Sequence, residues 1–118
     1  MLLVTPWLKA FFVTVLVETP LAARLLRPAE PRLARRIALV LFANLASHPA
    51  VWFIFPALGL PYLPTLVISE AWAVLSEALL YRLVFEKTDA VEALGISAVA
   101  NGASFGIGLL VRAATGWV

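Results

Sequence analysis

Apolar residues dominate four long stretches of the chain, at residues 3–25, 37–55, 63–85 and 91–111. Each stretch is close to the roughly 20 residues that an α-helix needs to cross about 30 Å of hydrocarbon. Almost nothing is left outside the bilayer. The pattern therefore predicts an all-α integral membrane protein with four transmembrane helices, which form a single domain over residues 1–118.

Two of these stretches contain a proline. Pro20 and Pro49 each remove a backbone donor and open a carbonyl one turn earlier, which favours a kink. The first stretch is followed by small residues that resemble a secretory cleavage site. However, it lacks a basic start, and Glu18 and Pro20 interrupt its apolar core, so we interpret it as a membrane helix.

A glutamate segment and an asparagine segment each occur twice, in the same order. The sequence VLVE at residues 15–18 recurs as VLSE at 74–77, and ANLAS at 43–47 recurs as ANGAS at 100–104. We predict two helical hairpins, about 1–58 and 59–118, that form a parallel internal repeat about an axis along the membrane normal. This axis would bring Glu18 opposite Glu77 and Asn44 opposite Asn101, in one layer around a polar core.

A second polar layer is expected above the first, and it is present in one half only. Glu70 lies two helical turns before the second glutamate, and His48 lies one turn after the first asparagine. Their counterparts in the other half are Phe11 and Phe105. Other polar side chains share these faces at helical spacing and are expected to support the site: Ser47, Ser97, Ser104 and Tyr81.

Composition and charge agree with a membrane protein. Of the 118 residues, 63% are hydrophobic and 14% are charged, whereas soluble domains have about a quarter charged. The net charge of +2 comes from loop arginines and does not indicate nucleic acid. With no cysteine, disulfide exchange and thiolate metal sites are excluded.

Loop charges predict the orientation. Five arginines lie at residues 24–36, from the end of the first apolar stretch to the start of the second, whereas the loop at residues 56–64 is uncharged. By the positive-inside rule the first loop is cytoplasmic, so both termini lie outside. We expect the cytoplasmic membrane of a bacterium or an archaeon.

The six candidate residues for binding a cation or proton are Glu18, Glu77, Asn44, Asn101, Glu70 and His48. A charge at the centre of a membrane helix costs about 3 kcal/mol, so acids there are functional by default. Two neighbouring carboxylates in a low dielectric do not both ionise cheaply and would share a proton or bind a cation. Alternatively, each acid is neutral and bonded to an asparagine, or reaches Arg24 or Arg82.

His48, Glu70 and Glu77 are the candidate metal ligands, because an imidazole with carboxylates suits zinc, iron or manganese. A divalent metal is therefore a candidate cofactor, although the Glu-x-x-His motifs of dimetal bundles are missing. His48 is alternatively a polar core residue or part of a proton relay. The Asn and Ser residues alternatively serve only to join the helices.

In its size and its first-helix glutamate the chain resembles the small multidrug transporters, four-helix proteins with one essential membrane carboxylate. It lacks their Trp and Gly signatures around the third helix and carries three membrane acids, so no family is assigned. We expect a transporter or channel-like protein that binds and moves a proton or divalent metal. The rival interpretations are an intramembrane enzyme acting on a lipid or isoprenoid, and a non-catalytic membrane subunit. The expected partners are membrane lipid, the cation and further copies of the chain, since one copy has a small cross-section.

Overall fold

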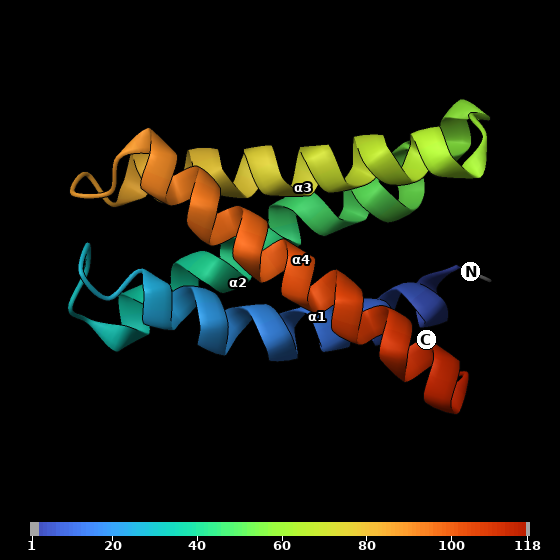
Figure 1. Cartoon of the computed structure of the whole chain (residues 1–118), viewed down its shortest axis with the longest axis horizontal. Coiled ribbons are helices and arrows are strands. Elements are labelled where there is room, and N and C mark those ends of the chain that lie inside the picture. The colour runs from blue at the N-terminus through green and yellow to red at the C-terminus, as the bar shows by residue number, and fades with distance from the viewer. Residues whose placement is uncertain (1–2, 118) are drawn as a thin grey trace.

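The computed structural model describes residues 3–117, and the regular structure in this range is entirely helical (Figure 1). The all-α prediction is thus confirmed. The elements in chain order are α1 (Val4–Leu25), α2 (Leu33–Pro49), the short η1 (Ala50–Ile54) and η2 (Pro56–Leu58), α3 (Tyr62–Val84) and α4 (Ala90–Thr115).

Within residues 3–117, three helical segments are long and apolar enough to cross a membrane. They are Leu33–Leu58, Tyr62–Val84 and Ala90–Thr115. The 22-residue α1, which carries Lys9 and Glu18, is not among them. The structure therefore supports a membrane protein with three candidate spans, and the predicted fourth span stays a prediction.

The four long helices form a ring. α1 packs against α2 and α4, and α3 packs against the same two helices. Both termini and the turn between α2 and α3 lie at one end of the molecule, and the α1–α2 and α3–α4 loops lie at the other (Figure 1). The longest axis measures 40 Å, which exceeds the roughly 30 Å of a hydrocarbon core.

The outer surface is apolar and much of the interior is polar. Leu8, Phe12 and Leu16 of α1 are exposed, with Leu16 at 62%. The other helices present apolar residues in the same way: Phe42, Leu45, Leu75, Leu79, Leu83, Val99 and Leu110. The buried polar residues include Glu18, Asn44, Ser47, Glu77, Ser97, Asn101 and Ser104. This distribution is typical of a bundle with lipid outside and a functional interior.

The two helix prolines act differently. Pro20 lies inside the continuous α1, whereas α2 ends at Pro49 and passes into a π-helical turn, η1. A proline that lacks an N–H and crowds the preceding turn favours such a change, and π turns are frequent at functional sites. Gly59 then ends η2 with a φ of 68°, a left-handed conformation that glycine adopts without steric cost.

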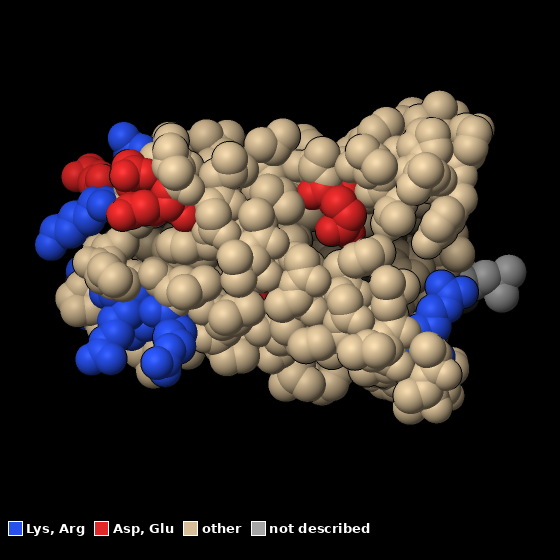
Figure 2. Space-filling view, in the orientation of Figure 1, with Lys and Arg blue, Asp and Glu red and all other residues tan. Residues whose placement is uncertain are grey.

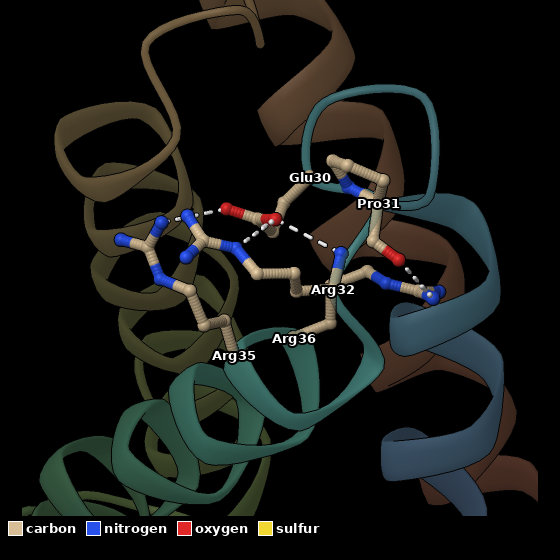
Figure 3. A network of polar contacts seen from close by, with 5 residues as sticks. All are labelled: Glu30, Pro31, Arg32, Arg35 and Arg36. Atoms are coloured by element: carbon tan, nitrogen blue, oxygen red, sulfur yellow. Dashed lines mark hydrogen bonds and ion pairs between the residues drawn. The ribbon is translucent and has the colours of Figure 1, made fainter.

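Charged residues gather at the loop end of the bundle (Figure 2). Glu30 of the α1–α2 loop receives hydrogen bonds from Arg32 and from the Arg35 guanidinium, the latter at 2.7 Å (Figure 3). The backbone N–H of Arg32 is the main reason that the pKa of Glu30 is lowered. This short network holds the loop in one conformation.

Arg36 points in the opposite direction, toward α1 (Figure 3). Its side chain is buried and donates to the carbonyl oxygens of Ala23 and Pro31. The start of α2 is therefore tied to the end of α1. At the neighbouring loop, Asp89 and Glu92 form a reciprocal capping box that begins α4, with the Glu92 N–H donating to Asp89 at 2.8 Å.

Candidate functional site

Two glutamates lie buried between the helices, with exposed fractions of 0% for Glu18 and 1% for Glu77. Ser104 Oγ donates to Glu18 Oε1 at 2.5 Å, and Ser47 Oγ donates to Glu77 Oε1 at 2.7 Å. Asn101 Nδ2 donates to Glu77 Oε2 at 2.8 Å. The two carboxyl groups line the same cavity and are close enough to interact electrostatically. These residues, with Asn44, form what we call the carboxyl layer.

Contacts in the carboxyl layer run crosswise between the two hairpins. Ser47 of the first hairpin reaches Glu77 of the second, and Ser104 of the second reaches Glu18 of the first. Such reciprocal contacts are those of a twofold interface, in which the same patch serves both partners. The predicted duplication of a hairpin requires such crosswise contacts, and the duplication itself stays a prediction.

The two asparagines are not equivalent in detail. Each donates to the carbonyl one turn earlier, Asn44 to Val40 and Asn101 to Ser97, both at 3.0 Å. Only Asn101 also donates to a carboxylate. Asn44 Oδ1 and Glu18 Oε2 are both buried and have no hydrogen-bond partner among residues 3–117. A proton on Glu18 would turn this carboxyl group from an acceptor into a donor.

The carboxyl layer is not neutralised by a basic side chain. Within residues 3–117 the ion pairs join Glu30 to Arg32 and to Arg35, both far from the layer at the loop end. Neither Glu18 nor Glu77 therefore forms the alternative ion pair with Arg24 or Arg82. Two adjacent buried carboxylates repel each other, so the pair retains a proton or a bound cation.

The carboxyl layer forms the floor of a cavity of about 360 Å³ that all four helices line. The cavity extends toward the end that carries the termini, where Pro56, Tyr62 and Arg112 lie around it. Figure 2 shows a hollow on one face of the bundle, with acidic atoms exposed in it, away from the charged ends. The floor is therefore reached from one side of the molecule.

His48 and Glu70 both line this cavity, but they are not a pair. His48 Nε2 lies 3.4 Å from Thr14 Oγ1, and the imidazole packs between Phe11 and Trp52, with centroid distances of 5.3 and 6.4 Å. Within residues 3–117 no hydrogen bond joins His48 to Glu70, because His48 faces the neighbouring α1 rather than α3.

The predicted metal ligands do not form a metal site. Among residues 3–117 no group of three or more His, Asp or Glu side chains is arranged to hold a metal ion, so His48, Glu70 and Glu77 are not such a cluster. Ser47 and Asn101 already occupy the Glu77 oxygens, and His48 is turned toward Thr14. Binding of a divalent metal at these three residues therefore stays a prediction that this arrangement does not support.

The supporting residues have separate roles. Ser97 Oγ donates to the Val74 carbonyl at 2.8 Å and joins α4 to α3. Tyr81 is fully buried on the loop side of the carboxyl layer, and its hydroxyl has no hydrogen-bond partner among residues 3–117. The prediction from the sequence did not include Thr14, although this residue lies one turn before Glu18 and so shares its face of the helix. Spacing from Glu18 was the signal that would have found it.

No family model matches the chain, and neither a curated protein nor a solved structure is similar to it.

Proposed function

We propose that this protein spans the membrane with four helices, binds a small cation at the carboxyl layer and carries it across in exchange for protons. The observation that supports this most strongly is the pair of adjacent, buried carboxyl groups of Glu18 and Glu77, which have no basic partner and lie at the floor of a cavity. Such intramembrane acids mark ion pathways and proton relays.

Exchange at the carboxyl layer conserves charge. With one proton on the pair, the layer carries a charge of −1, and the proton is held where Glu18 Oε2 and Asn44 Oδ1 lack a donor. A monovalent cation that replaces this proton leaves the charge at −1. Hydrogen bonds to the two carboxyl groups persist in both states, because their donors, Ser47, Ser104 and Asn101, do not depend on the proton or the cation.

Access to the carboxyl layer is one-sided, as alternating access requires. Beyond the layer, toward the loop end, Tyr81, Leu26, Val40 and Phe85 pack into a closed apolar plug. The cavity extends from the layer toward the other end, which the positive-inside rule places outside the cell, and its hollow lies on a side face of the bundle (Figure 2). Rocking of one hairpin against the other would open the plug, with the π turn after Pro49 as the flexible point.

The proposed membrane frame includes α1. Its exposed face carries Leu8, Phe12 and Leu16, which continues the apolar surface of the other helices, and its 22 residues suffice to span. Both termini then lie outside, in a cytoplasmic membrane. Lipid covers the apolar surface, and a second copy of the chain is the proposed protein partner.

Proton movement tests the proposal. Purified protein is reconstituted into liposomes that contain a pH-sensitive dye and a monovalent cation such as K⁺, and dilution into buffer without that cation sets an outward cation gradient. Protein-containing liposomes are expected to take up protons faster than empty ones. Glu77→Gln and Glu18→Gln each remove an exchangeable site, so uptake falls to the level of empty liposomes. Glu92→Gln, at an exposed acid of the capping box, is the matched control and keeps the wild-type rate.

Two results would overturn the proposal. Wild-type uptake in folded Glu77→Gln protein, checked by helical circular dichroism and gel filtration, would leave the polar layer a role in joining the helices only. Turnover of added lipid without any proton uptake would favour the intramembrane enzyme instead.

A further inference from the structure

The cavity above the carboxyl layer is much larger than a proton or a bare ion needs. Its volume of about 360 Å³ is roughly ten times the 30 Å³ that one water occupies in the liquid. Pockets for small organic molecules begin at about 300 Å³. The cavity therefore has the size for a compact organic molecule.

The charge of the cavity favours a cation. Glu70 of α3 lines it, half-buried, in addition to the two glutamates of the floor, whereas the basic residue in the lining is Arg112 at the mouth. Within the part of the chain that the structure describes, no hydrogen bond or ion pair engages the Glu70 carboxylate. A carboxylate only accepts hydrogen bonds, so N–H donors with a positive charge satisfy it best.

The remaining wall suits an apolar body. Val13 and Leu66 line the cavity from α1 and α3, and the rings of Trp52 and Phe105 line it from η1 and α4. Aromatic and aliphatic walls with a few polar groups are typical of sites that bury a small organic ligand. Aromatic faces also attract an adjacent cation.

We infer that the cation carried by this protein is a protonated organic amine, whose ammonium group is held by Glu70 on its way to the carboxyl layer and whose apolar body lies against Trp52 and Phe105. This inference rests on the proposed function and names the class of its substrate. Glu70 has Phe11 as its counterpart in the first hairpin, so the acid that lines the cavity is present in one half of the repeat only.

Binding of 2-phenylethylammonium to protein in detergent, measured by calorimetry, tests the inference. The uncharged 2-phenylethanol has nearly the same shape and is the matched ligand control. We expect saturable binding of the amine, at least about tenfold tighter than the alcohol, a factor that corresponds to about 1.4 kcal/mol. The N,N,N-trimethyl derivative has the charge but no N–H donor and is expected to bind more weakly.

Two variants locate the site independently. Glu70→Gln keeps the shape and removes the charge, so the Kd for the amine is expected to rise about tenfold. Leu66→Trp keeps the charge and fills the cavity, so binding of the amine is lost. Glu92→Gln lies outside the cavity and leaves the Kd unchanged. Equal affinity for amine and alcohol, or an unchanged Kd in Glu70→Gln, would overturn the inference.

The outcome is separable from the test of the proposed function. Proton uptake that depends on Glu77, with no binding of the amine, would overturn the substrate class and leave proton exchange standing. Amine binding that depends on Glu70, with no proton uptake, would overturn transport and retain the cavity as an amine site. Tighter binding of the trimethyl derivative would overturn the role assigned to N–H donors.

Discussion

Substituting each of the two repeated asparagines in turn compares a position that bonds to a carboxylate with an equivalent position that does not. Asn44 and Asn101 occupy equivalent positions, are both buried, and both donate to a carbonyl one turn earlier at 3.0 Å. Asn101 alone adds a 2.8 Å bond to the Glu77 carboxylate. We expect Asn101→Ala to destabilise the protein more than Asn44→Ala.

The difference can be worked out from these contacts. Both substitutions remove an amide of the same volume and one bond to the backbone, so the cavity and backbone contributions cancel. What remains is the bond of Asn101 to the Glu77 carboxylate and a longer one, at 3.3 Å, to Ser97 Oγ. Side-chain hydrogen bonds between membrane helices average about 0.6 kcal/mol and reach about 1.7 kcal/mol, and bonds to charged groups are the strong ones. Asn101→Ala is therefore expected to cost about 1–2 kcal/mol more than Asn44→Ala.

Reversible unfolding in mixed micelles, followed by circular dichroism as the fraction of denaturing detergent rises, measures both free energies of unfolding. The comparison requires equal slopes for the two variants, so that their denatured states are comparable. Equal losses within about 0.5 kcal/mol, or a larger loss for Asn44→Ala, would refute the reasoning. Such a result would mean that Asn44 bonds to Glu18 as strongly as Asn101 bonds to Glu77.

Two further predictions concern the loop end. The pKa of Glu30 is lowered from 4.5, so the ionised side chain stabilises the folded protein fully above pH 4.5. This stabilisation is lost as the pH falls through the lowered pKa. The difference in Tm between wild type and Glu30→Gln should accordingly vanish in acid. Arg36→Met removes charged donors to the Ala23 and Pro31 carbonyls and should lower the free energy of unfolding by about 2 kcal/mol in the same micelle assay, whereas an unchanged value would contradict the proposed tie between α1 and α2.

Much of the carboxyl layer could be anticipated because the polar residues are rare and repeat. The helical period places Asn44 and Ser47 on one face, and the repeat then places Glu77 opposite the same face. A buried acid in an apolar bundle has few alternatives to these partners, since the surface faces lipid. The observed bonds of Ser47 and Ser104 to the two glutamates follow this logic.

The positions of the second polar layer, His48 and Glu70, could not be anticipated in the same way. His48 and Glu70 lack counterparts in the repeat, so nothing related their positions except the count of residues along each helix. The π turn after Pro49 changes the rotation of the chain just beyond His48, and the imidazole packs against Phe11 and beside Thr14. Spacing along a sequence does not reveal how a helix is rotated toward its neighbours.

The sequence by itself determined that the chain is helical, that its outside is apolar and that its scarce acids and amides lie inside, because hydrocarbon tolerates neither open backbone groups nor unpaired charges. Only the tertiary structure decided which oxygen meets which donor, that His48 faces α1, and that the helices leave a cavity above Glu18 and Glu77. These features depend on side-chain directions and on the distances between helix axes, which are set by packing among all four helices at once.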